Sequence, residues 1–147
     1  MIIDSRLGRK EIDEEKIVHF PKGLIGFENL HDFVLLQFSE SSPFLVLQSV
    51  ADPKTGLLVA DPFSFLPEYT LVVGAAEQTI LQAVNHEDLA VLVTASIPPG
   101  QPDKTALNLL GPILINHTIK TGLQVPQAGN KGPSRYYLST MQVESQE

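Results

Sequence analysis

The apolar residues of this chain come in short runs that are rich in β-branched side chains and bounded by polar turns. Runs of this length and composition are typical of β-strands and not of amphipathic helices. They predict strands at residues 33–38, 44–50, 57–61, 70–73, 89–97 and 119–125. The only convincing helical spacing lies in EQTILQAV, residues 77–84, which predicts a helix of about two turns after Gly74.

Glycine and proline mark the places where the predicted strands end or bend. In the turn DPKTG, residues 52–56, proline fixes φ and glycine accepts a positive φ, so residues 44–61 are expected to form a β-hairpin. The apolar run at residues 106–116 is broken by Gly111-Pro112, and proline cannot donate to a strand ladder. This run is therefore expected to be one strand that turns a corner of a barrel.

Eight or more short strands with one or two short helices predict a mostly β protein. We expect a small single-domain antiparallel β-barrel that spans residues 1–147, with a flexible tail after about residue 126. A length of 147 residues suits one ordinary domain. The absence of cysteine excludes disulfides, thiolate metal sites and thiol nucleophiles. No signal peptide or membrane-spanning apolar run is present, so we expect a soluble, cytoplasmic protein.

The charge of −7 is concentrated in the middle of the chain. Between Lys22 and Lys104, ten acidic residues stand against one basic residue, Lys54. A phosphate backbone binds through clustered lysine and arginine, so this distribution argues against direct nucleic-acid binding. An acidic surface instead keeps a protein soluble or steers it toward a basic protein partner.

Residues with catalytic potential are present but scattered. The four histidines lack the spacing of metal ligands, and no serine stands in a nucleophile elbow. We therefore expect no catalytic, metal or cofactor site. Two alternatives stay open. One is a small enzyme that uses the loop carboxylates of Asp52, Asp61 and Asp103. The other is a direct RNA binder whose basic and aromatic residues are Lys131, Arg135, Tyr136 and Tyr137.

The stretch FPKGLIGFENL, residues 20–30, places two glycines three residues apart, as in loops that clamp a phosphate backbone. The residues between the glycines are Leu24 and Ile25, which are apolar, and this favours a buried turn instead. The glycines would allow the tight turn. The large apolar residues of the stretch and its surroundings are then expected to form a plug over one end of the barrel: Phe20, Leu24, Ile25, Phe27, Leu30 and Phe33.

Residues 20–36, FPKGLIGFENLHDFVLL, resemble the signature Phe-Pro-x-Gly-x-x-Gly-Phe-Glu of the FliW family of flagellar assembly factors. Weaker motifs follow in the family's order, including NLLGPILIN at residues 108–116 and GLQV at residues 122–125. Ile25 replaces a proline that many members carry, and the tail after Val125 resembles the family less. The motif residues to which we assign a structural role are Phe20, Pro21, Gly23, Gly26, Phe27, Asn108, Pro112 and Asn116.

The resemblance implies a small β-barrel and a non-enzymatic, protein-binding regulator. Members of the family bind CsrA, a dimeric RNA-binding protein, and stop it from repressing translation of flagellin mRNA. They also bind flagellin in the cytoplasm as a chaperone-like partner. By resemblance, the partners of this chain are CsrA and flagellin, and the chain is a monomer when free.

The resemblance does not show where CsrA would bind on this chain, so we infer a binding site from the distribution of charge. An acidic surface would complement the basic surface with which CsrA holds RNA. The acids expected in the loops between the middle strands and around the short helix are Asp61, Glu68, Glu77, Glu87 and Asp88. If these acids do not bind, the next candidate is the apolar patch at residues 63–66.

Overall fold

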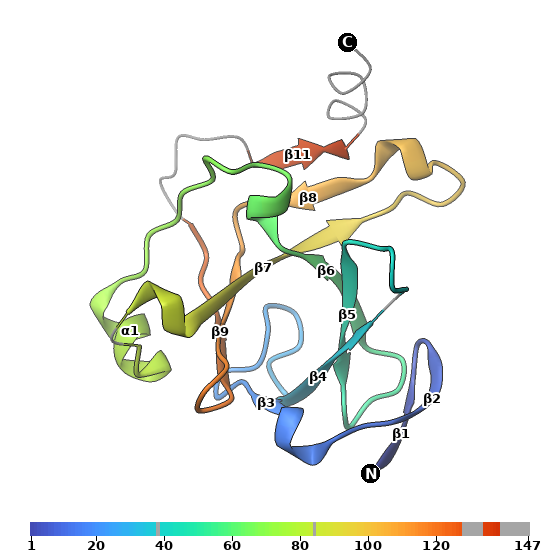
Figure 1. Ribbon diagram of the computed structural model, residues 1–147, viewed down its shortest axis with the longest axis horizontal. Helices are drawn as coiled ribbons and strands as arrows, with labels where there is room; N and C mark the ends of the chain where they lie inside the picture. Colours follow the sequence, from blue (N-terminus) through green and yellow to red (C-terminus); the bar gives the residue numbers. More distant parts are fainter. Residues whose placement is uncertain (38, 84, 128–133, 139–147) are drawn as a thin grey trace.

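The computed structural model describes residues 1–37, 39–83, 85–127 and 134–138. Within these residues the main element is a sheet of nine strands (Figure 1), accompanied by one two-stranded hairpin. The hairpin consists of β1 (Ile2–Ser5) and β2 (Gly8–Glu11). The strands of the main sheet are β3 (Val18–His19), β4 (Asp32–Gln37), β5 (Phe44–Ser49), β6 (Gly56–Ala60), β7 (Leu89–Ser96), β8 (Ala106–Asn108), β9 (Ile113–Asn116), β10 (Thr121–Gln124) and β11 (Arg135–Tyr137).

Helical structure is short and lies between the strands. The α-helix α1 (Ala75–Leu81) confirms the helix predicted after Gly74. It ends earlier than predicted, because Gln82 takes a left-handed conformation with φ of 51°. Four 3-10 turns accompany it in the described part of the chain: η1 (Glu14–Lys16), η2 (Pro62–Ser64), η3 (His86–Asp88) and η4 (Pro102–Lys104). None of the helices among the described residues is long and apolar enough to cross a membrane.

The main sheet closes on itself. Its strand order is β11-β8-β7-β6-β5-β4-β3-β10-β9, and β9 also pairs with β7, so the strands from β7 to β9 form a ring. All pairings of the ring are antiparallel except the short parallel contact between Thr121 of β10 and His19 of β3. The mostly β fold is therefore confirmed, and the closed sheet has the form of a small barrel.

Most of the predicted strands are present. The hairpin expected at residues 44–61 is confirmed as β5 and β6, which pair from Phe44 with Ala60 to Gln48 with Gly56. The predictions for residues 33–38, 89–97 and 119–125 correspond to β4, β7 and β10. Residues 38 and 84, which end two predicted elements, lie outside the described residues.

The prediction of a strand at residues 70–73 is wrong. The N–H of Val72 donates to Oε1 of Gln127 at 2.7 Å, and Nε2 of Gln127 donates to the Val72 carbonyl at 3.0 Å. The side-chain amide of Gln127 thus takes the place of a neighbouring strand. The alternation that suggested a strand is real, because Leu71 and Val73 pack inward while Val72 is exposed.

The run at residues 106–116 forms two strands and not one. β8 and β9 both pair with β7, with Leu107 opposite Ala95 and Ile113 opposite Leu92. The chain leaves this ladder between Asn108 and Ile113, where Gly111-Pro112 was expected to cause a bend. The bend is therefore at the predicted residues, but it separates two strands instead of bending one.

Two pairings at the ends of the chain were not predicted. The β1–β2 hairpin packs on the outside of the barrel, where it buries the apolar cluster of Ile3, Ile12, Val34, Leu36 and Val46. β11 pairs with β8, so residues 135–137 of the expected flexible tail form a strand. The rest of that tail, 128–133 and 139–147, falls outside the described residues.

The barrel interior is filled by large apolar side chains from most strands of the ring. Phe20, Phe33, Leu47, Val59 and Ile113 are fully buried in one cluster. The rings of Phe20 and Phe33 meet edge to face, with centroids 5.4 Å apart. This arrangement is favourable for two aromatic quadrupoles and fixes the start of the signature segment in the core.

Candidate partner-binding surface

The signature loop is a tight turn whose beginning is buried and whose tip is exposed. Phe20 and Leu24 are inaccessible to solvent, and the Phe27 N–H donates to the Leu24 carbonyl at 2.8 Å. Gly23 and Gly26 both have positive φ, +65° and +88°. Ile25 lies between them and is 61% exposed. The buried-turn interpretation is confirmed for Phe20 and Leu24, but Ile25 is wrongly assigned to the apolar plug.

Gln124 connects the signature loop to the second motif. Its Oε1 accepts a hydrogen bond from the Ile25 N–H at 2.9 Å, and its Nε2 donates to the Gly111 carbonyl at 3.0 Å. Ile25 and Gly111 are far apart in sequence, and Gln124 itself belongs to the GLQV motif. Three motifs that are separate in sequence thus meet at one side chain.

An apolar groove lies where these motifs meet. We call it the motif groove and define it by the lining residues Ile25, Phe27, Leu57, Leu110, Gly111 and Gln124. Its volume is about 460 Å³. Leu110 is 36% exposed, so it and Ile25 leave large apolar side chains in contact with solvent. Exposed apolar surface beside a groove is typical of a protein-binding site.

The remaining motif residues differ in burial and in hydrogen bonding. Asn116 is 4% exposed, and its Nδ2 donates to the Leu81 carbonyl at the end of α1, 2.8 Å away. Its Oδ1 accepts from the Thr118 N–H at 3.1 Å, so the residue joins β9 to the helix and to the following turn. The Pro112 carbonyl accepts from Val125, and Oδ1 of Asn108 accepts from Leu110. Pro21 is exposed and Phe27 is half-buried.

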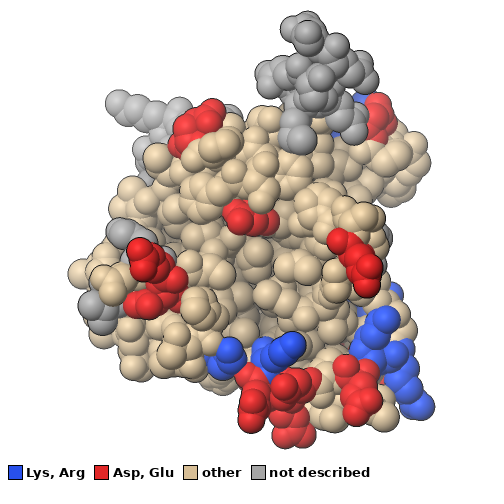
Figure 2. Space-filling model, in the orientation of Figure 1, with Lys and Arg blue, Asp and Glu red and all other residues tan. Residues whose placement is uncertain are grey.

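The five acids expected to meet a basic partner lie on three separate segments. Asp61 and Asp88 cap turns, because their carboxylates accept from the N–H groups of Phe63 and Asn85 at 2.9 and 3.2 Å. Glu68 follows η2, Glu77 lies in the first turn of α1, and Glu87 lies beside Asp88 in η3. On the face drawn in Figure 2, acidic side chains form separate groups, and those at the lower edge of the view lie beside lysine and arginine. Of the five, Glu87 and Asp88 are neighbours in one short turn.

The apolar alternative at residues 63–66 is mostly packed into the protein. The rings of Phe65 and Phe44 stack with centroids 6.2 Å apart, and Leu66 packs on the same buried cluster. Phe63 is 38% exposed and contacts the ring of Tyr69, whose hydroxyl donates to the Leu109 carbonyl. Burial raises the pKa of Tyr69. The segment therefore offers one exposed aromatic ring and not a continuous patch.

The carboxylates of the enzyme alternative do not converge. Asp52 precedes β6, Asp61 follows β6 and Asp103 lies in η4, so the three carboxylates belong to different segments. The Thr55 hydroxyl donates to Oδ2 of Asp52 at 2.7 Å and the Lys54 N–H donates to Oδ1. These two hydrogen bonds lower the pKa of Asp52, which keeps it ionised and unsuited to donate a proton. Among the described residues, no group of three or more histidine and acidic side chains is placed to hold a metal ion.

The residues of the RNA-binding alternative are only partly accessible. Arg135 and Tyr137 are exposed on β11, while Tyr136 packs on the buried cluster that contains Tyr69 and Leu107. A side chain packed in this way is not free to stack on a base. Lys131 lies outside the described residues.

Three residues that give the motif groove its shape were not identified from the sequence. Leu57 appeared only as part of a strand, and Leu110 only as part of an apolar run. Gln124 was noted within the GLQV motif without a role. A polar residue between apolar strand positions was the one available signal, because a buried or half-buried amide must find hydrogen-bond partners.

Comparisons with known proteins identify the family. The family model described as FliW protein matches residues 1–138. The flagellar assembly factor FliW of Nitratidesulfovibrio vulgaris, strain Hildenborough, is 60% identical over 136 residues, which cover 92% of this chain and 79% of the relative. The same factor of Thermotoga maritima is 36% identical over 139 residues, covering 95% of this chain and 93% of the relative.

The fold agrees with this match. A crystal structure of the flagellar assembly factor FliW superposes with a TM-score of 0.87 at 33% sequence identity, covering 94% of this chain and 96% of that one. The matches extend over nearly the whole described chain, from the β1–β2 hairpin to β11. The chain therefore belongs to the FliW family of flagellar assembly factors.

Proposed function

We propose that this chain is a cytoplasmic, non-enzymatic regulator that binds two proteins, CsrA and flagellin. Bound to CsrA, it prevents repression of flagellin mRNA translation. Bound to flagellin, it acts as a chaperone-like partner and leaves CsrA free to repress. The observation that carries this proposal is the match to the flagellar assembly factor family over residues 1–138. The motif groove, with Ile25 and Leu110 exposed, supports a role in protein binding.

A gel-shift assay with purified CsrA and flagellin leader RNA tests the proposal. Adding this chain should release the RNA from CsrA, and adding flagellin should restore the CsrA–RNA complex. The chain alone should not shift the RNA even at low salt, because its middle is acidic and its basic residues are dispersed. A shift by the chain alone would support the RNA-binding alternative, and failure to release RNA would contradict the proposal.

We further propose that CsrA docks on the acids between the middle strands and around α1, which are Asp61, Glu68, Glu77, Glu87 and Asp88. Glu87 and Asp88 lie at the centre of this contact. The double variant Glu87→Lys and Asp88→Lys should slow association with CsrA about tenfold at low salt and flatten its salt dependence. Surface binding measured at two ionic strengths gives both quantities. A melting curve checks the fold, because Asp88 accepts the Asn85 N–H.

Glu14→Lys combined with Glu15→Lys is the matched control. These two acids are also neighbours in an exposed 3-10 turn, η1, and their replacement changes the net charge by the same amount. If both double variants slow association equally, only the overall charge matters and the proposed binding site is wrong. If neither variant changes association, the motif groove becomes the preferred site for CsrA.

A further inference from the structure

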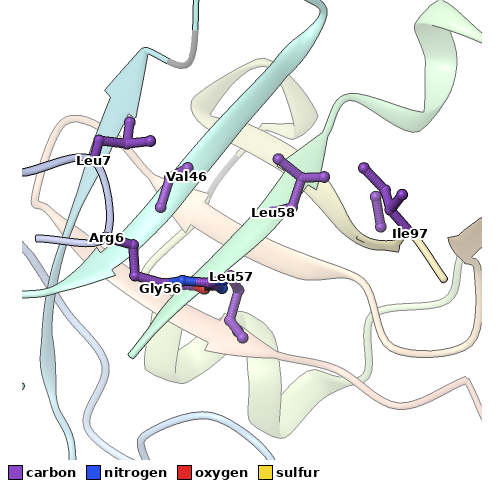
Figure 3. A pocket seen from close by; sticks show the side chains of 8 residues that line it. Arg6, Leu7, Val46, Gly56, Leu57, Leu58 and Ile97 are labelled. Atoms are coloured by element: carbon purple, nitrogen blue, oxygen red, sulfur yellow. Dashed lines mark hydrogen bonds between the residues drawn. The ribbon is translucent and has the colours of Figure 1, made fainter. Parts of the chain in front are cut away.

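A second groove lies on the outside of the barrel beside the tip of the β1–β2 hairpin (Figure 3). We call it the Arg6 groove and define it by Arg6, Leu7, Val46, Leu58 and Ile97. Its volume is about 470 Å³. Its walls come from the hairpin turn, from β5 and β6, and from the end of β7, and Ile97 is 48% exposed. The groove is therefore apolar along most of its length and open to solvent.

One edge of β6 borders this groove, and the backbone of that edge is only partly paired with another strand. β6 pairs with β5 along its whole length, but its register with β7 contains only Val59 and Ala60. Ala95 and Ser96 of β7 pair with β8, which lies on the edge of β7 that faces away from β6. Gly56, Leu57 and Leu58 thus have no residue of β7 opposite them in the register. An edge of this kind is a template for an additional strand.

Arg6 occupies the end of this edge and carries a charge that the described residues do not neutralise. Its Nη1 donates to the Gly56 carbonyl at 2.8 Å, and its backbone N–H donates to Oε1 of the fully buried Gln48 at 3.0 Å. The ion pairs among the described residues are Arg9 with Asp4 and His19 with Asp32, and neither includes Arg6. The guanidinium has five N–H donors, so it can hold the edge carbonyl and still bind a carboxylate.

The site is shaped to keep Arg6 in this position. A Cβ at residue 56 would lie 2.6 Å from Oε1 of Gln48, 3.0 Å from Val46 and 3.1 Å from Cδ of Arg6, so any larger residue there would displace these side chains. Nε2 of Gln48 in turn donates to the carbonyls of Ser49, Asp52 and Pro53. The hairpin tip is thereby anchored to the turn before β6, and the cation is fixed at the end of the apolar groove.

We propose that the Arg6 groove binds an extended peptide segment of a partner protein, which adds as a strand to the free edge of β6. Alternate side chains of a strand point to the same face, so two apolar residues would lie against Leu58 and Ile97. An acidic residue on that same face, at the end of the segment, would bind Arg6. This site adjoins the motif groove, with which it shares the lining residues Leu57 and Ala95. It does not depend on CsrA or flagellin as partners.

The chemistry of the bound peptide follows from the charge of Arg6, which is in no ion pair among the described residues. The whole chain carries a charge of −7, so an acidic ligand gains nothing from long-range attraction. A carboxylate binds here only if it reaches Arg6 directly. Reversing the charge of Arg6 therefore tests whether the segment binds in this groove and whether it does so through a carboxylate.

The probe is a fluorescein-labelled synthetic peptide of about seven residues, close to the usual strand length. Two valines and one glutamate take alternate positions, with threonine between them. Both sequence orders are used, one for each strand direction. In anisotropy titrations up to about 1 mM, one order should bind saturably, as expected of a weak single-strand contact. Absence of saturable binding by both orders overturns the proposal.

The charge and register controls identify the contact. Arg6→Glu should weaken binding about tenfold and confer binding on a peptide with lysine in place of glutamate. Arg9→Glu, in the same hairpin, should leave binding unchanged. Moving the glutamate by one position places it on the opposite strand face and should weaken binding as much as Arg6→Glu does. Equal binding of the original and shifted peptides would overturn the proposal.

The backbone contact is tested separately. Methylation of those peptide amides that would donate to β6 should abolish binding, whereas methylation of the alternate amides should not. Equal effects of both methylated peptides would exclude strand addition. If sedimentation shows that the chain dimerises and the peptide disperses the dimer, the occupant is a second copy of this chain and the peptide proposal is overturned.

Discussion

Replacing Gly23 by valine is expected to lower the free energy of unfolding by roughly 4 kcal/mol. Gly23 has φ of +65°, where a β-branched residue is strained by about 1–3 kcal/mol. A Cβ at this position would also lie 2.6 Å from the Phe27 carbonyl oxygen and 2.7 Å from Cα of Glu28. These are backbone atoms and cannot rotate away, so overpacking adds about 1–3 kcal/mol more. Denaturant unfolding measures the loss.

Gly26→Val is the matched control for Gly23→Val. Gly26 also has a positive φ, +88°, but no atom lies within 4 Å of the position of a Cβ. Only the conformational strain remains, about 1–2 kcal/mol. Equal losses at the two glycines would show that φ alone matters and would contradict the close approach at Gly23.

The same two variants separate the structural and functional interpretations of the loop. If Gly23→Val unfolds the protein while Gly26→Val retains both fold and partner binding, the glycines serve the turn. If Gly26→Val remains folded but loses CsrA binding, the exposed tip around Ile25 is part of the binding surface. The second result would move the proposed CsrA site from the acids to the motif groove.

The parts of the fold that could be predicted from the sequence are those whose partners lie nearby in the chain. The β5–β6 hairpin needs only two alternating strands and the turn that begins at Asp52, all within a short segment. The helix α1 needs only its own periodicity and a glycine before it. In both cases local propensity and tertiary structure agree, which is the usual condition for a correct prediction.

The errors arise where the partner is distant or is not a strand. Residues 70–73 alternate like a strand, but their partner is the side chain of Gln127. The β1–β2 hairpin was missed because all four residues of β2, Gly8–Glu11, are exposed and mostly charged. Its stability comes instead from Ile3 and Ile12, which pack on the outside of β4 and β5.

The candidate surfaces show the same limit. The motif sequences identified which loops are distinctive, but the groove between them depends on Gln124, whose partners are Ile25 and Gly111. The sequence does not distinguish Arg6 from the other charged residues near the N-terminus. Its position at the edge of β6 follows from hydrogen bonds to Gly56 and to Gln48, contacts that no local pattern reveals.

Gly122→Ala is expected to destabilise the protein by about 2–3 kcal/mol, although an alanine is normally tolerated in a strand. A Cβ at residue 122 would overlap the ring of Phe20, with Cζ at 2.5 Å and Cδ2 at 2.9 Å. Phe20 is fully buried and its ring is held edge to face against Phe33, so it has no space into which to move. Thermal and denaturant unfolding measure the cost.

A double-mutant cycle with Phe20→Leu tests this cause directly. Leucine lacks the ring atoms equivalent to Cζ and Cε2, which are the two atoms nearest to the new methyl group. Gly122→Ala should therefore cost less than half as much in the Phe20→Leu background, a coupling of about 1–2 kcal/mol. If the two losses simply add, the ring does not limit residue 122. In that case the packing of Phe20, at the start of the signature segment, would not require glycine at residue 122 of β10.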